Sequence, residues 1–130
     1  MHKEGNFLAK QWDPQLLKSL TNEQTIKVAP DYADHRALTP IIVWFVRVGN
    51  DLYVRAYRGP RSKWYQSAVK QGTGQAELDG HQLSVKFAPV DRSSFVNKTV
   101  NQEYLAKYHG NSMLWMVENA LDSTLKVSPK

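Results

Sequence analysis

Hydrophobic and polar positions alternate through the middle of the chain in a way that predicts a β-hairpin. Residues 41–48 are rich in β-branched and aromatic side chains, which favours a strand, and residues 49–51 make a turn of hairpin length. The return strand is predicted over residues 52–58, and successive side chains of a strand point to opposite faces. One face carries Leu52, Val54 and Ala56, and the other carries Tyr53, Arg55 and Tyr57.

Further strands are predicted on both sides of this hairpin. Residues 74–78 and 81–87 flank an Asp-Gly pair and predict a second hairpin. Residues 25–28 and 125–127 predict two short single strands. The segment 29–40 contains two prolines and two aspartates, and we expect it to be a loop.

Capping residues and helical spacing predict four helices. Asp13, followed by a proline, starts a short helix that ends near residue 22, and Ser62 caps a helix that ends at residue 71 before a glycine. Residues 113–121 predict a further short helix. Asp91 is predicted to cap a longer helix, one side of which carries Phe95, Val96, Val100, Tyr104 and Leu105.

These elements indicate the α+β class. Antiparallel strands with helices segregated around them favour an antiparallel β-barrel with flanking helices over a parallel sheet. The chain has 130 residues, a length typical of one domain, and no linker divides it. We therefore expect a single domain over residues 1–130, in which residues 1–11 form a mobile N-terminal tail.

The composition excludes several classes of site. The chain has no cysteine, which excludes disulfides, thiolate metal sites and cysteine nucleophiles. Its N-terminus has no apolar run typical of a signal peptide, and its longest apolar run, residues 41–46, is too short to span a bilayer. A cytoplasmic protein is the expectation that follows.

The excess positive charge lies in one segment, residues 36–70. This segment has seven basic residues and a single acid, Asp51, so its net charge is +6, whereas the whole chain carries +5. The same segment holds six aromatic residues: Trp44, Phe45, Tyr53, Tyr57, Trp64 and Tyr65. Arginines interleaved with aromatic rings suit a ligand that is both flat and anionic, such as a nucleotide, a flavin phosphate or a nucleic acid strand.

Residues 53–65 are the candidate binding site, because a strand end, a Gly-Pro turn and a capped helix follow one another there. Free N–H groups at a helix N-terminus attract phosphate. Arg58 and Arg61 flank the turn and suit bidentate binding of phosphate oxygens. Arg55 shares its strand face with two tyrosines, against which a flat ring can rest. The alternative interpretation is a set of solvated surface arginines over a barrel whose aromatic residues are core.

No catalytic constellation is evident in the sequence. The histidines are not spaced as metal ligands and the acids do not cluster, so no metal site is predicted. The chain has no serine elbow, no P-loop and no G-x-G-x-x-G motif. A bound cofactor would therefore have to supply the chemistry, with Tyr53, Tyr57 and His35 as candidates for proton donation or substrate orientation.

Several motifs point to a known family. They are Ile-Val-Trp-Phe-Val-Arg-Val at 42–48, Asp-Leu-Tyr-Val-Arg at 51–55, Tyr-Arg-Gly-Pro at 57–60, and the pair Trp64-Tyr65. With these motifs the chain resembles a small bacterial family catalogued as domain of unknown function 2255, which has no established activity. The later Tyr104-x-x-Lys107-Tyr108 is similar to the helix of that family, and residues 125–129 to its closing strand.

The layout is more distantly similar to the split β-barrels that bind FMN or the deazaflavin F420, in which the cofactor phosphate lies near the turn before a tryptophan-containing helix. That resemblance implies a cofactor site formed by Arg36, Trp44, Tyr53, Arg55, Arg58, Gly59, Arg61, Ser62 and Trp64. Related deazaflavin enzymes have a Gly-Arg pair followed by Ser-Gly, whereas this chain has His35-Arg36 followed by Ala-Leu. Such barrels are commonly homodimers with the cofactor site near the subunit interface, so the resemblance implies a homodimer.

Three functions are consistent with the sequence. The leading hypothesis is a flavin-type split barrel that binds FMN or the deazaflavin and acts as an oxidoreductase. The second is a non-catalytic barrel that binds another anionic small molecule. The third is single-stranded nucleic acid binding, which ranks last because the remainder of the chain is slightly acidic and several aromatic residues belong to strands expected to be buried.

Overall fold

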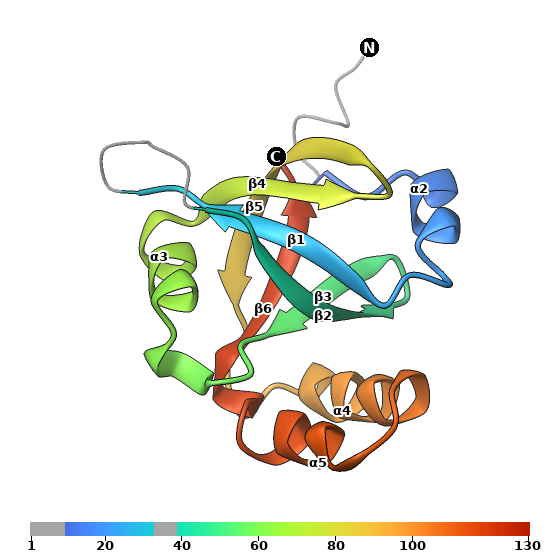
Figure 1. Ribbon diagram of the computed structural model, residues 1–130, viewed down its shortest axis with the longest axis vertical. Helices are drawn as coiled ribbons and strands as arrows, with labels where there is room; N and C mark the ends of the chain where they lie inside the picture. Colours follow the sequence, from blue (N-terminus) through green and yellow to red (C-terminus); the bar gives the residue numbers. More distant parts are fainter. Residues whose placement is uncertain (1–9, 33–38) are drawn as a thin grey trace.

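The strands close into an antiparallel barrel in the order β1-β2-β3-β6-β5-β4 (Figure 1). The computed structural model describes residues 10–32 and 39–130. Its strands are β1 (Thr25–Pro30), β2 (Ile41–Val48), β3 (Asp51–Arg55), β4 (Thr73–Leu78), β5 (His81–Pro89) and β6 (Thr124–Pro129). All neighbouring strands pair antiparallel, including β1 with β4. The predicted antiparallel barrel with flanking helices is confirmed.

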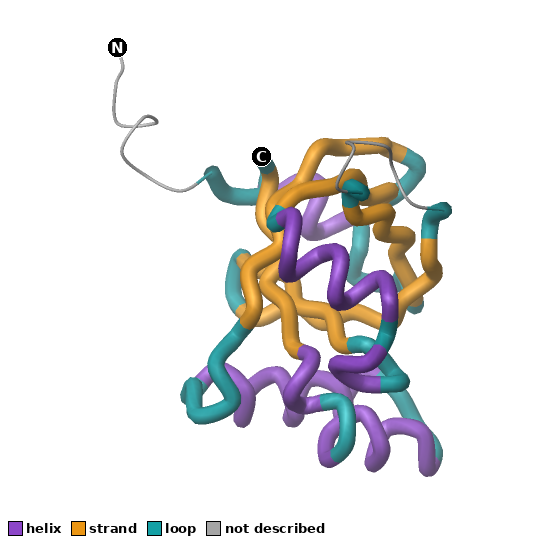
Figure 2. Tube along the Cα trace, turned by 90° about the vertical axis from the view of Figure 1, so that its left-hand side faces the viewer, coloured by secondary structure: helices purple, strands orange, loops and turns teal. Residues whose placement is uncertain are grey.

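Helices lie on two opposite sides of the barrel and over the outer face of β2 and β3. The described residues form α2 (Pro14–Ser19), α3 (Lys63–Gln71), α4 (Val96–Lys107) and α5 (Asn111–Glu118), with 3-10 turns η1 (Gly59–Arg61) and η2 (Leu121–Ser123). Figure 1 shows α2 and α3 on opposite sides of the barrel, and α4 and α5 side by side below β2 and β3. The two latter helices form the lower layer in the turned view as well (Figure 2). None of the described helices is long and apolar enough to cross a membrane.

Local sequence explains where α2 and α3 begin and end. Asp13 caps α2, because its carboxylate accepts a hydrogen bond from the Gln15 backbone N–H at 2.9 Å, and Pro14 occupies the first turn. Ser62 is the residue before α3, and Gly72 ends that helix with a φ of 71°, in the left-handed region that favours glycine. Both helices were predicted at these positions, although α2 ends earlier than expected.

The apolar side chains form two clusters, one on each face of the sheet. The inner cluster fills the barrel and includes Leu52 and Val54 of β3. The outer cluster joins the sheet to α4 and α5, and it consists of Val46, Tyr53, Val100, Tyr104, Tyr108, Met113, Met116 and Ala120. The predicted alternation along β3 is therefore confirmed, but both of its faces are buried.

The start of α4 differs from the prediction. Asp91 does not cap this helix: its carboxylate accepts hydrogen bonds from the backbone N–H and the hydroxyl of Ser93, and α4 begins only at Val96. Phe95 is consequently 95% exposed and Leu105 is exposed as well, whereas Val100 and Tyr104 are buried and Val96 is partly buried. The spacing identified the helix but placed its first turn too early.

The two termini of the described chain lie close to each other. Lys10 Nζ donates a hydrogen bond to the backbone carbonyl of Lys130 at 2.9 Å. Trp12 is buried, and its indole N–H donates to the Val127 carbonyl at 2.9 Å. The rest of the predicted tail, residues 1–9, lies outside the described residues, as do residues 33–38 of the predicted loop.

Candidate functional site

A pocket of about 1020 Å³ lies where β2, the end of β3, the start of α3 and α5 meet. Seven of the residues predicted for the site line this pocket: Trp44, Arg55, Tyr57, Arg58, Arg61, Ser62 and Trp64. The structure thus brings together residues that are up to twenty positions apart in the chain. Their role in holding a ligand stays a prediction.

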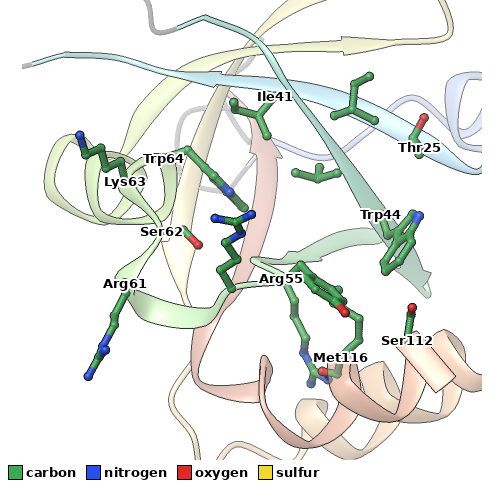
Figure 3. A pocket seen from close by; sticks show the side chains of 14 residues that line it. Thr25, Ile41, Trp44, Arg55, Arg61, Ser62, Lys63, Trp64, Ser112 and Met116 are labelled. Atoms are coloured by element: carbon green, nitrogen blue, oxygen red, sulfur yellow. Dashed lines mark hydrogen bonds between the residues drawn. The ribbon is translucent and has the colours of Figure 1, made fainter.

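Aromatic residues stand on two sides of the pocket. Figure 3 shows Trp44 of β2 and Trp64 of α3 on opposite sides of the view, with the cavity between them. The Trp44 ring meets the Tyr57 ring edge to face at a centroid distance of 6.0 Å. Tyr57 in turn packs against Trp115, whose indole N–H donates to the Tyr57 carbonyl at 2.6 Å. These contacts give one wall a fixed aromatic surface against which a flat ligand can pack.

The described lining residues include four cations and no Asp or Glu. The cations are Arg55, Arg58, Arg61 and Lys63. Figure 3 shows the side chains of Arg61 and Lys63 pointing outward, so these two cations belong to the rim. A concave surface lined by one sign of charge raises the local concentration of ligands of the opposite sign, so the pocket attracts anions.

The start of α3 adds donors at the same rim. Ser62 occupies the N-cap position, but its hydroxyl makes no capping hydrogen bond. The first-turn N–H groups of a helix have no intrahelical acceptor and carry a partial positive charge. Arg58 and Arg61 flank this point in the chain. The first turn of α3 and these two arginines together therefore suit a phosphate group.

Arg55 is the least expected member of the site, since its side chain is only 1% exposed. Its Nε donates to Thr124 Oγ1 at 2.8 Å, and its Nη1 donates to Asn101 Oδ1 and, at 3.2 Å, to the Met116 carbonyl. Its Nη2 donates to Asn97 Oδ1 at 3.3 Å and to the Asn97 carbonyl at 3.5 Å. Arg55 therefore ties β3 to β6, α4 and α5 while it also borders the pocket (Figure 3).

The charge of Arg55 is not paired with an acid in the described part of the chain, because all five of these acceptors are neutral oxygens. Burial lowers the pKa of the Arg55 guanidinium to about 10, and the nearby Tyr104 opposes that shift. A pKa of this size leaves the side chain charged at neutral pH. The same guanidinium lies 5.6 Å from the centre of the Tyr104 ring.

Tyr53 does not reach the pocket, which corrects the expectation that it faces the ligand. Its side chain is 6% exposed and packs in the outer cluster, because α4 and α5 cover the face of β3 that carries it. Burial, and secondarily the charge of Asp51, raises the pKa of Tyr53. A buried phenol with a raised pKa outside the pocket is not placed to donate a proton there.

Tyr57 reaches the pocket for a reason that strand alternation does not predict. β3 ends at Arg55 rather than at the predicted residue 58, so Tyr57 lies in the turn that follows. There it is exposed and lines the cavity. Gly59 is buried in the next turn, with a φ of 78°, and is not among the lining residues. His35 and Arg36 lie outside the described residues.

Other lining residues were not singled out from the sequence. Ile42 contributes from β2, and Ser112 and Met116 contribute from α5, one helical turn apart. Met116 is almost completely buried. No local signal shows that α5 returns to the end of β3. The two asparagines that bind Arg55 carry a weak signal, since Asn97 and Asn101 are four residues apart and share one face of α4.

No metal site is evident in the structure. The described residues contain no group of three or more His, Asp or Glu side chains that could hold a metal ion. The pocket lining described above includes neither His nor Cys.

Comparisons with known proteins agree with the fold. A family model described as an uncharacterized protein conserved in bacteria (DUF2255) matches residues 16–127. No curated protein sequence matches the chain.

Three solved structures share the barrel at low sequence identity. The heme storage protein HutZ from Vibrio cholerae has a TM-score of 0.73 and 10% identity, over 92% of this chain and 91% of that one. The conserved hypothetical protein Rv2991 from Mycobacterium tuberculosis has a TM-score of 0.62 and 9% identity, over 98% and 83%. A proposed 5-nitroimidazole antibiotic resistance protein from Bacteroides thetaiotaomicron has a TM-score of 0.60 and 10% identity, over 90% and 79%. All three are split-barrel, FMN-binding-like folds, which is the fold predicted from the sequence.

Proposed function

We propose that this chain, which belongs to the DUF2255 family of uncharacterized bacterial proteins, binds a flat, phosphorylated cofactor of the flavin type in the pocket between Trp44 and Trp64. The observation that supports this proposal is the composition of the lining, which combines four cations with three aromatic residues and, among the described residues, no acid. A site of this kind complements a planar ring that carries an anionic tail.

The residues present fit FMN on two counts. The rim holds Arg58, Arg61 and the uncapped start of α3, which would bind the phosphate. The aromatic wall of Trp44 and Tyr57, with Trp64 opposite, would hold the ring and exclude water from it. The deazaflavin F420 would use the same features, but its further contact at Arg36 falls outside the described residues.

Oxidoreductase activity is the reaction class that such a cofactor would support, because flavins and deazaflavins carry the hydride themselves. The described lining offers no Asp, Glu or His for acid–base chemistry. Tyr57 is the one lining residue with an exposed phenol, so its role would be to orient a substrate or donate a proton. A second candidate, non-catalytic binding of another anionic small molecule, is supported by the same scarcity of acid–base groups.

Haem is a third possible ligand, since HutZ is named a heme storage protein. The rim cations would match the haem carboxylates, but iron coordination would depend on Tyr57 or Met116 alone among the lining residues. We therefore rank haem below a phosphorylated flavin. Nucleic acid binding ranks lower still, because the aromatic residues line a pocket and Tyr53 is buried.

We also propose that the protein is a homodimer whose interface borders this pocket. Ile42 lines the pocket and is 64% exposed, and Trp115, which packs on the pocket residue Tyr57, is 45% exposed. Exposed apolar side chains of this size beside a ligand site are typical of a contact with another protein surface. Light scattering during gel filtration would test this proposal, and a monomer at all protein concentrations would contradict it.

An FMN titration tests the proposed function. We expect saturable quenching of flavin fluorescence and a raised melting temperature, and weaker binding of riboflavin, which lacks the phosphate. Arg58→Ala should reduce FMN affinity by about tenfold without changing the melting temperature, since the side chain is exposed and gives up a charge-assisted phosphate contact. Arg47→Ala is the matched control, because Arg47 is an exposed arginine outside the pocket that bonds to the Gly49 carbonyl.

Three outcomes would contradict parts of this model. Absence of quenching and of thermal stabilisation would show that FMN is not the ligand. The same titration with the deazaflavin would then decide whether any flavin binds. Equal affinity for FMN and riboflavin would show that the start of α3, with Arg58 and Arg61, does not bind the phosphate group. Equal losses in Arg58→Ala and Arg47→Ala would show that only the net charge of the protein matters.

A further inference from the structure

Arg55 combines three properties that together require an explanation. It is almost completely buried, it borders the pocket, and its guanidinium donates only to neutral oxygens in the described part of the chain. A buried charge without a partner of opposite sign is costly, and proteins usually pair such a charge with an acid. None of the salt bridges among the described residues involves Arg55.

The amide of Asn101 occupies the position at which a carboxylate would pair with Arg55. Asn101 Oδ1 accepts from Arg55 Nη1, and Asn101 makes no other side-chain hydrogen bond within the described structure. An aspartate has nearly the same size and shape, so a carboxylate at this position would meet the guanidinium in the same geometry. Asn97 differs, because its amide N–H groups also donate to the carbonyls of Asp91 and Arg92, which an aspartate could not do.

We propose that Arg55 is left without a carboxylate partner so that the ligand in the pocket supplies the opposite charge, which makes Arg55 the residue that selects anionic over neutral ligands. This inference rests on the proposed function in taking that pocket as the ligand site. It adds a second source of selectivity to the rim, where Arg58 and Arg61 are exposed and therefore strongly screened by solvent.

Arg55 acts in this proposal through its charge rather than by binding the ligand directly. Its donors already bind Thr124, Asn101, Met116 and Asn97, so none is needed for the ligand. These bonds hold the guanidinium at a fixed place beside the cavity. The field of a fixed, buried charge is weakened by water much less than that of a mobile surface arginine, so it discriminates ligand charge more strongly.

Asn101→Asp tests the inference because it supplies the missing carboxylate without removing Arg55. Asn101→Ala is the matched control, since it removes the same hydrogen bond without adding charge. The probes are FMN, riboflavin and inorganic pyrophosphate, each measured at constant ionic strength, with the melting temperature of the ligand-free protein recorded for every variant.

We expect Asn101→Asp to melt at or above the wild-type temperature and yet to bind FMN and pyrophosphate about tenfold more weakly, with riboflavin affinity little changed. We expect Asn101→Ala to melt lower and to keep its preference for FMN over riboflavin. In this model the carboxylate of Asn101→Asp neutralises the charge of Arg55, so the substitution does not lower the melting temperature. A variant that keeps its stability and yet binds anions more weakly is therefore the result that the model predicts.

Several outcomes would overturn the inference. Unchanged anion affinity in Asn101→Asp would show that the charge of Arg55 does not reach the ligand. Equal losses of affinity in Asn101→Asp and Asn101→Ala would assign the effect to the hydrogen bond, and a melting temperature of Asn101→Asp below that of Asn101→Ala would show that Arg55 gains nothing from an acid.

The pyrophosphate arm separates this inference from the proposed function. If the wild-type protein binds pyrophosphate but not FMN, the flavin proposal fails, and a weakened pyrophosphate affinity in Asn101→Asp still supports the role of Arg55. If the wild-type protein binds neither probe, the inference is overturned as well.

Discussion

The substitution Tyr108→Phe tests the contact that fastens α4 to the barrel next to the pocket. Tyr108 is buried, and its hydroxyl lies where β1 and β2 diverge. The hydroxyl oxygen accepts a hydrogen bond from the Phe45 backbone N–H at 3.1 Å. Its proton can be donated to the Gln24 carbonyl at 2.7 Å or to the Phe45 carbonyl at 2.8 Å.

The expected loss follows from what each of these groups can do without the hydroxyl. Gln24 is exposed, so its carbonyl can bind water, and the Phe45 carbonyl keeps the hydrogen bond from Lys107 Nζ at 3.2 Å. The Phe45 N–H is buried and is left without an acceptor. One unsatisfied buried donor and one lost hydrogen bond together cost about 2–3 kcal/mol of the free energy of unfolding. For a chain of this length that loss lowers the melting temperature by about 8–12 °C.

Tyr104→Phe is the matched control for this measurement. Tyr104 is buried on α4, and its hydroxyl donates a hydrogen bond to the Trp44 carbonyl at 3.0 Å. Its removal should cost about 1 kcal/mol. Urea unfolding followed by circular dichroism gives both values. A cost below about 1 kcal/mol for Tyr108→Phe, or one no larger than that of Tyr104→Phe, would refute the reasoning that the Phe45 N–H depends on this hydroxyl.

Three further changes test other parts of the structure. Trp64→Ala should cost about 1–2 kcal/mol rather than the 3–5 kcal/mol of a fully buried tryptophan, because the side chain is half-buried, and it should weaken FMN binding in the same titration. Gly74→Ala should cost at least about 3 kcal/mol in urea unfolding or abolish folding, because a Cβ there would lie 2.5 Å from the Ala29 carbonyl oxygen. Burial raises the pKa of Tyr108 to about 12, against about 10 when unfolded, so its contribution to stability is complete below pH 10 and is lost as the pH rises through 12. Urea unfolding between about pH 9 and 11.5 should therefore show a steeper loss for the wild-type protein than for Tyr108→Phe, and parallel curves would contradict this assignment.

Local patterns sufficed to predict the strands and the barrel, because each hairpin is contiguous in the chain. The turn at 49–51 and the glycine after α3 specify local geometry without any distant contact. The outer face of β3 was predicted less well. Its cover comes from α4 and α5, which begin at residues 96 and 111, far beyond the end of β3 at residue 55, and the sequence does not show which strand they pack against. The sequence therefore predicted Tyr53 as a ligand contact, whereas the structure shows that its side chain is buried.

Arg55 illustrates the same limit at the site. Its place next to two tyrosines predicted a ligand contact on an open strand face, but α4 contributes Asn97 and Asn101 as acceptors, and these allow the guanidinium to be buried. Arg58 and Arg61 were easier to place, because the turn and helix that position them are adjacent in sequence. The rim of the pocket was thus predictable from local sequence, whereas its floor depends on tertiary packing.

The polar side chains of α4 provide a reason why this helix matters for binding although none of its residues lines the pocket. Asn97, Asn101 and Tyr104 follow one another at spacings of four and three, so they share one face of the helix, and Tyr108 comes directly after its last residue. The two asparagines hold Arg55, and the two tyrosines bind the backbone of β2 at Trp44 and Phe45. This face therefore supports both the cation at the floor of the pocket and the strand that carries its aromatic wall. Substitutions along it should shift ligand affinity together with stability, except at Asn101, where an aspartate is expected to separate the two.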